Sequence, residues 1–163
     1  MAAVALHDAI LDCSRGAIRP TIKWPNDLQV GPAKLAGILL ERAVDQIVVG
    51  IGVNLAYAPE VAGRETMSLA DLGTSITPQA FASLLATTFA EELTRWRTDG
   101  ITQTIAHWTD RAHPHGTRLT ISEGSDAGLT GAFDGLDATG SLRLRLDDGA
   151  LRLVTAGEVR YAL

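Results

Sequence analysis

Side chains able to do chemistry gather in one short stretch of this chain, between Lys23 and Asn54. Within it Lys34 begins an apolar strand pattern, and Asn26 and Asp27 follow a proline. A lysine at such a place can bind a carboxylate or stabilise charge on a transferring phosphate, because partial removal from water strengthens its electrostatic effect. A solvated lysine at a strand end is the alternative. The stretch predicts a site for a small acidic ligand beside a nucleotide phosphate.

Glycines interrupt the apolar strands of this stretch at Gly37, Gly50 and Gly52. A glycine inside a strand weakens it, and it often marks the close approach of a ligand or of another backbone. The alternation of Gly50 and Gly52 leaves one face of their strand without side chains, which suits a flat ligand. A helix crossing close over the sheet explains the same pattern, so both interpretations stay open.

The polar residues of the stretch also have simpler explanations. Asn26 and Asp27 lie in the turn after Pro25, and turns on a rigid scaffold often carry function, but turn formation alone accounts for them. Asn54 ends its strand and either offers an amide to a phosphate or terminates the strand. The chain has no Walker-type loop, dinucleotide fingerprint or nucleophile elbow. Its four histidines lack the spacing of a metal site, and we expect none.

Hydrophobic spacing predicts the elements that position these residues. Thr77 and Pro78 have the residue types of a helix N-cap and first position, and the stripe that follows, with Trp96 facing inward, predicts a long helix ending near Gly100. The other predicted helices cover 2–13, 68–72 and 101–111, and the predicted strands cover 21–24, 28–30, 34–42, 46–53, 118–122, 128–136, 141–146 and 150–155.

These elements predict an α+β fold. The first strands are joined by short turns, which favours a mixed, mainly antiparallel sheet with helices on one face. The short glycine-punctuated strands after His113 suit a small antiparallel barrel. We therefore predict two domains, residues 1–112 and residues 113–163.

Composition limits the classes of partner. The chain has 163 residues, 46% of them hydrophobic, and a formal net charge of −5. This charge gives no basic field for DNA or RNA, and no apolar run is long enough to span a bilayer. A single cysteine, Cys13, agrees with a reducing compartment. We expect a cytoplasmic protein with no DNA partner and no membrane partner.

The motifs of the stretch, taken together, resemble one enzyme family. They are Lys-Trp-Pro-Asn-Asp-Leu at 23–28, Lys-Leu-Ala-Gly-Ile-Leu at 34–39 and Gly-Ile-Gly-Val-Asn at 50–54, with weaker segments at 131–137, 140–142 and 156–159. In this order and spacing they resemble the biotin-[acetyl-CoA-carboxylase] ligases of the BirA type. The resemblance covers nearly the whole chain. It implies a class II synthetase-like catalytic domain, incomplete at its N-terminus, and a C-terminal SH3-like domain.

The resemblance also implies a reaction in two steps. Biotin attacks the α-phosphate of MgATP to give biotinyl-5'-AMP, and a lysine of the biotin carboxyl carrier protein then attacks this mixed anhydride. By the same resemblance, Lys34 and Asp27 are the catalytic residues. Residues implied to contact biotin are Lys34, Gly37, Leu39, Gly50, Gly52 and Val53, and those implied to contact the nucleotide are Asn26, Asp27, Lys34 and Asn54.

One expected part of the family pattern does not occur in this sequence. A Gly-Arg-rich nucleotide loop and the first sheet strands precede the family's equivalent of residues 2–13, so we expect about half of the pocket here and weak activity of this chain alone. Two alternatives to an active ligase are a catalytically incomplete binding or regulatory module and one half of a split enzyme. A homodimer is compatible with the resemblance.

Overall fold

The computed structural model describes residues 1–162, which form two helices and nine strands. In chain order the elements are α1 (Ala2–Cys13), β1 (Thr21–Lys23), β2 (Asp27–Val30), β3 (Ala33–Ala43), β4 (Gln46–Val53), α2 (Pro78–Thr109), β5 (Arg118–Ile121), β6 (Thr130–Leu136), β7 (Leu142–Arg145), β8 (Leu151–Val154) and β9 (Val159–Tyr161). All ladders between these strands are antiparallel. The structure therefore confirms an α+β fold with antiparallel sheets.

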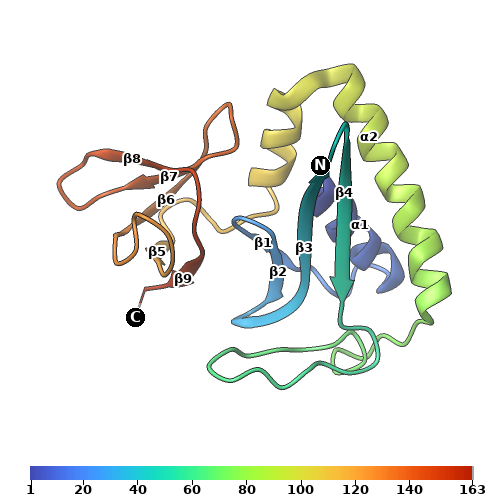
Figure 1. The fold of residues 1–163 in the computed structure, drawn as a ribbon. Helices are drawn as coiled ribbons and strands as arrows, with labels where there is room; N and C mark the ends of the chain where they lie inside the picture. Colours follow the sequence, from blue (N-terminus) through green and yellow to red (C-terminus); the bar gives the residue numbers. More distant parts are fainter. Residues whose placement is uncertain (163) are drawn as a thin grey trace.

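The first sheet has the strand order β1-β2-β3-β4, with α1 and α2 on one of its faces (Figure 1). Short turns at 24–26, 31–32 and 44–45 make each strand pair with the next. Alternating residues of the strands then face the helices, and the core between the layers contains Val4, Leu6, Ile10, Leu28, Leu35 and Ile38. The opposite face of β3 and β4 carries the glycines and is left open to a ligand.

Helix α2 is two helices joined at a kink. Its residues pack against α1, where the Thr88 hydroxyl donates to the carbonyl of Ala5 at 2.9 Å. Gly100 has φ 78° and ψ −175°, a conformation that glycine adopts without strain. The predicted break at this residue is therefore confirmed.

The N-terminus of α2 is capped by Thr77, whose hydroxyl accepts a hydrogen bond from the Ala80 amide at 3.3 Å. We expect Thr77→Ala to lower the free energy of unfolding by about 1 kcal/mol, because this amide loses its partner. Urea denaturation of the two chains measures the difference. Thr98→Ala, on the exposed side of the same helix, is the control and should change stability by less than half as much.

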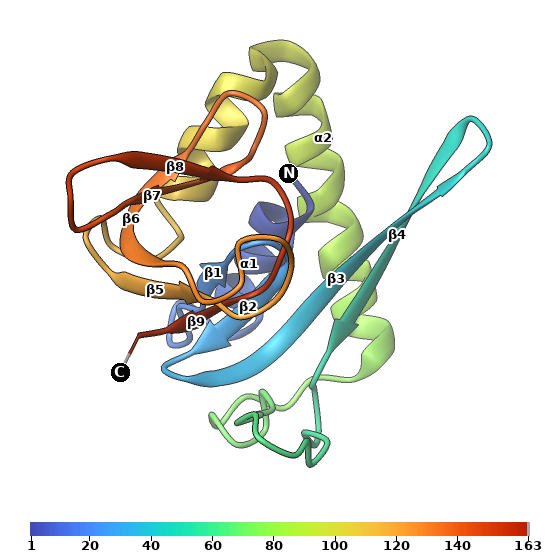
Figure 2. The same cartoon turned by 60° about the vertical axis from the view of Figure 1, so that its left-hand side comes forward.

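The second sheet has the order β8-β7-β6-β5-β9 (Figure 2), and its buried side chains belong to the same core cluster as those of the first sheet. The fully buried residues on its strands are Leu119, Ile121, Phe133, Leu142, Leu144, Val154 and Val159. Strand β9 was not predicted, because only three residues form it and its partner β5 lies about forty residues earlier in the chain. The proposed division at residue 113 stays a prediction.

Two local predictions were wrong. Residues 68–72 form turns rather than a helix, because Asp71 accepts hydrogen bonds from the amide and hydroxyl of Ser68 and closes a turn. Trp96 is exposed, since the apolar groove between β4 and α2 ends at Leu93. Neither helix in residues 1–162 combines the length and apolar character needed to cross a membrane.

Candidate functional site

Lys34 and Asp27 form an ion pair on the open face of the first sheet. Lys34 Nζ lies 2.5 Å from Asp27 Oδ1, and the two side chains are 30% and 8% exposed. The β2–β3 ladder shifts register between Leu28 and Gln29, so Asp27 pairs with Gly37 while Lys34 pairs with Gln29. This irregularity places the side chains of Lys34 and Asp27 on the same face of the first sheet. The pair places a cation that a ligand can reach next to a nearly buried anion.

Gly37 lies against this ion pair, and its lack of a side chain leaves room for the Lys34 ammonium. A Cβ atom at this position would lie 2.9 Å from Lys34 Nζ, 3.1 Å from Lys34 Cε and 3.2 Å from Asp27 Oδ1. Its neighbour across the ladder is Gly52, where an added Cβ would meet no atom within 4 Å. The space above Gly52 is therefore open, and in residues 1–162 the two helices lie on the other face of the sheet.

A cavity of about 430 Å³ lies over this face. Five of the predicted site residues line it, together with five others: Lys34, Gly37, Gly52, Val53 and Asn54, with Ala36, Pro59, Val61, Arg64 and Thr66. The loop between β4 and α2 supplies the last four residues and forms one wall. The structure thus brings the lysine, two of the glycines and the strand-ending asparagine to one cavity.

The remaining predicted residues lie outside the lining of this cavity. Leu39 and Gly50 are paired with each other further along β3 and β4, and Leu39 is 60% exposed. Asn26 holds the turn against β3: its side-chain amide donates to the carbonyl of Ile38 at 2.6 Å, and its own carbonyl accepts from the Ile38 amide. Their assigned contacts with biotin and nucleotide stay predictions.

The side chain of Asn54 connects the loop between β4 and α2 to strand β3, which carries Lys34. Its side-chain amide donates to the carbonyls of Met67 and Lys34, at 3.0 Å and 3.3 Å. The Lys34 carbonyl also accepts a hydrogen bond from the Met67 backbone amide, and the Lys34 backbone amide donates to the backbone carbonyl of Glu65. The backbone of Lys34 is therefore held by hydrogen bonds on both its amide and its carbonyl.

Arg64 joins the ion pair to the C-terminal sheet, a role that the sequence did not indicate. One guanidinium nitrogen lies 3.8 Å from Asp27 Oδ2, and another contacts the carboxylate of Glu158. Glu158 precedes β9 and also lies 3.8 Å from Lys23 Nζ. Arg64 stands in a loop without periodicity and Glu158 is about ninety residues away, so no sequence pattern links them.

Lys23 is the second lysine of the region, and its environment differs from that of Lys34. Burial lowers the pKa of the Lys23 ammonium, while the carboxylates of Asp27 and Glu158 act in the opposite direction. Its side chain is 13% exposed. The ion pairs form one connected network, which contains Lys34, Asp27, Arg64, Glu158 and Lys23.

His113 lies beside this chain of charges and gives the protein a pH dependence. Burial, and secondarily the positive charge of Lys23, lower its pKa from 6.5 to about 4. The unfolded chain then binds a proton that the folded chain does not, so the stability associated with neutral His113 is full above about pH 6.5 and is lost as pH falls towards 4. From this group we expect a loss of about 2 kcal/mol between pH 7 and pH 5.

Urea denaturation at both pH values checks this expectation. His113→Phe should remove that part of the pH dependence, whereas His107→Phe, on a more exposed part of α2, serves as the control and should keep it. Equal pH dependence in the parent chain and His113→Phe would show that His113 is not the group responsible.

Comparisons with known proteins show the family of this chain. The family model of the biotin protein ligase C-terminal domain matches residues 118–160. A biotin-[acetyl-CoA-carboxylase] ligase of Paracoccus denitrificans is 36% identical over 99% of this chain, which spans 71% of that protein. The chain belongs to the biotin protein ligase family.

Other proteins of this family are similar as well. A biotin-[acetyl-CoA-carboxylase] ligase of Mycobacterium tuberculosis is 34% identical over 85% of this chain, which spans 52% of that ligase. The apo biotin protein ligase of Aquifex aeolicus superimposes with a TM-score of 0.85 over 99% of this chain and 73% of its own, at 19% identity. A structure of the Aquifex ligase with biotin and ATP gives 0.80 at 20% identity. At this identity the superposition shows the shared fold.

Proposed function

We propose that the chain acts as a biotin-[acetyl-CoA-carboxylase] ligase. It forms biotinyl-5'-AMP from biotin and ATP and passes biotin to a lysine of a biotin carboxyl carrier protein. The observation that carries the proposal is the position of Lys34 Nζ, 2.5 Å from Asp27 at the edge of the glycine-lined cavity. The similarity to ligases of this activity at 36% and 34% identity supports it.

In the first step, the biotin carboxylate attacks the α-phosphate of ATP, which enters as its Mg²⁺ complex, and pyrophosphate leaves. Negative charge grows on the phosphoryl oxygens as the new bond forms. Lys34 offsets that charge, and it is suited to do so because its backbone is fixed while its partly exposed ammonium reaches the cavity. The cavity face without Cβ atoms at Gly37 and Gly52 accepts the flat biotin rings, with Val53 at its border.

In the second step, the amine of the carrier lysine attacks the carbonyl carbon of the mixed anhydride, and AMP leaves. The attacking amine must be uncharged, so its proton must pass to a base. Asp27 is the carboxylate at the site, and Arg64 near its second oxygen helps to hold it in place. Lys34 again stabilises charge, now on the departing phosphate. The second sheet, which we assign as an SH3-like barrel, supports this end of the site through Glu158.

The free edge of the first sheet favours a second candidate role. Among the strands of residues 1–162, β4 pairs only with β3, and the hairpin tip that they form projects from the body (Figure 2). Its apolar side chains Leu40 and Ile47 are 63% and 70% exposed. Such an edge pairs readily with another strand. The chain would then be a ligase-like binding module whose pocket is completed by further polypeptide, in the same chain or in another.

Incubation with biotin and MgATP separates the two roles. We expect slow formation of biotinyl-5'-AMP, detected by chromatography of the quenched mixture, and transfer to an added biotin carboxyl carrier domain. Binding of synthetic biotinyl-5'-AMP without any turnover favours the incomplete module. A chain that neither binds nor forms this adenylate contradicts the proposed function.

A further inference from the structure

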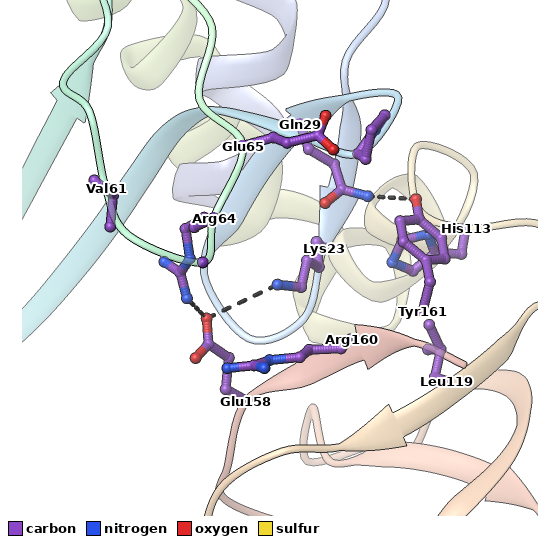
Figure 3. A pocket seen from close by; sticks show the side chains of 12 residues that line it. Lys23, Gln29, Val61, Arg64, Glu65, His113, Leu119, Glu158, Arg160 and Tyr161 are labelled. Carbon is purple, nitrogen blue, oxygen red and sulfur yellow. Dashed lines mark hydrogen bonds and ion pairs between the residues drawn. The ribbon is translucent and has the colours of Figure 1, made fainter. Parts of the chain in front are cut away.

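The second sheet contacts the first through polar side chains that line a cleft of about 480 Å³ (Figure 3). The Gln29 side-chain amide donates to the Tyr161 hydroxyl, and that hydroxyl oxygen lies 3.3 Å from His113 Nδ1. Arg64 and Glu158 form an ion pair in the same cleft. On the second sheet, these contacts are made by side chains in or beside β9, which forms one edge of that sheet.

Trp24 makes a separate contact between the two sheets. Its indole Nε1–H donates to the backbone carbonyl of Gly140 at 3.2 Å, and Gly140 lies in the turn between β6 and β7. Trp24 is buried, with 5% of its surface exposed, and neither residue lines the cleft. The motif at 23–28 and the weaker segment at 140–142, which are far apart in sequence, therefore meet at this hydrogen bond.

The turn that presents the Gly140 carbonyl is closed by its own hydrogen bonds. Asp137 Oδ1 accepts from the backbone amides of Thr139 and Ser141, at 2.8 Å and 2.9 Å. Gly140 has φ 87°, which glycine adopts without strain, and an added Cβ there would meet no atom within 4 Å. The backbone conformation, rather than lack of space, therefore requires glycine at this position.

On the first sheet, Trp24 begins the turn between β1 and β2 that leads into Asp27. The far side of this turn is attached to β3, because the side-chain amide and the backbone carbonyl of Asn26 both bond to Ile38. The near side is attached to the second sheet by the Trp24 indole. Asp27 follows directly and pairs with Lys34, so a shift of the turn alters this ion pair.

We propose that Trp24 is a positioning residue for the ligase reaction. Its hydrogen bond to the second sheet holds the turn, and thereby sets the geometry in which Asp27 meets Lys34. The proposal rests on the proposed function. Trp24 lies outside the lining of the cavity over Lys34, so it acts through Asp27 rather than on the ligand.

Trp24→Phe tests the donor side, because phenylalanine keeps an aromatic ring and lacks the N–H group. We expect single-turnover formation of biotinyl-5'-AMP to slow by about tenfold, since the loss of one buried hydrogen bond has an effect of about this size. The biotin concentration at half-maximal rate should change by less than about twofold, because the binding contacts of the cavity are kept. A loss of stability alone would not separate the two quantities in this way.

The acceptor side has a closely matched control in the turn between β7 and β8. Gly149 has φ 85° there, an added Cβ would meet no atom within 4 Å, and its carbonyl accepts from Arg145 rather than from the first sheet. Gly140→Ala and Gly149→Ala therefore introduce similar strain and should lower the unfolding temperature alike. We expect Gly140→Ala to slow adenylate formation by about threefold, because the strained turn displaces the carbonyl, and Gly149→Ala to keep the parent rate.

NMR of the chain without ligand gives a readout that needs no turnover. We expect the indole N–H of Trp24 to exchange slowly with solvent, unlike that of Trp96, which is 42% exposed. Gly140→Ala should speed this exchange and shift the Lys34 Nζ resonance, and Gly149→Ala should do neither.

The proposal is overturned if Gly140→Ala and Gly149→Ala act alike in these measurements, or if Trp24→Phe leaves the Lys34 Nζ resonance in place. A parent chain that forms no adenylate contradicts the proposed function instead. The resonances then still decide the role of Trp24, so the two failures are distinguishable.

Discussion

Lys34→Ala lowers the rate of biotinyl-5'-AMP formation by about 10²–10³-fold, the usual effect of removing one donor that stabilises developing charge. The structure gives the reason: Lys34 Nζ is the cation of the candidate cavity that lies nearest to Asp27, at 2.5 Å, and hydrogen bonds to the loop between β4 and α2 hold its backbone. Lys34→Arg should restore only part of the rate, because a planar guanidinium fills the space beside Gly37 differently from an ammonium.

The measurement is a single-turnover assay with radiolabelled ATP, compared with the parent chain. Arg42→Ala is the control, because it removes an exposed cation near the far end of the same strand, outside the cavity. A Lys34→Ala chain that forms the adenylate at the parent rate would show that the role given to Lys34 is wrong. Unchanged thermal unfolding of the variant would show that the loss is local.

Gly37→Ala weakens binding of biotinyl-5'-AMP by about tenfold, even though it adds a single methyl group. The new Cβ would lie 2.9 Å from Lys34 Nζ, so the ammonium at the end of this flexible side chain must move, and the loss of one charge-assisted hydrogen bond to the ligand has an effect of about this size. Gly52→Ala is the informative comparison. Its Cβ enters the same cavity but meets no atom within 4 Å, so it alters the space for ligand without moving the ion pair.

Calorimetry with synthetic biotinyl-5'-AMP measures the affinities, and the NMR resonance of Lys34 Nζ reports the ion pair. We expect that resonance to shift in Gly37→Ala and to stay in Gly52→Ala. A Gly37→Ala chain with parental affinity and an unshifted Lys34 resonance would contradict the geometry described for the pair.

The sequence predicted most of what is local. Strand β4, the cap at Thr77 and the break at Gly100 follow from alternation, capping chemistry and the conformational freedom of glycine, which act within a few residues. Its motifs also indicated the family. The parts that depend on tertiary structure were missed. Strand β9 exists because β5 pairs with it, and Arg64 meets Asp27 and Glu158 only when the loop and the second sheet have folded.

The cluster of Gln29, Tyr161 and His113 illustrates the same limit. Each residue is unremarkable by type and spacing, and the sequence placed His113 at a proposed domain boundary. Folding buries it instead against Phe133 and Tyr161, with edge-to-face contacts at centroid distances of 6.0 Å and 5.2 Å. Such a cluster leaves no periodic pattern, because its members come from three separate segments.

The most direct test of the central claim is to map where biotinyl-5'-AMP binds on the ¹⁵N-labelled chain by NMR. The account predicts that the largest amide shifts fall on Gly37, Gly52 and Asn54, together with a shift of Lys34 Nζ. No change at these four positions under saturating ligand, or changes confined to another surface, would contradict it.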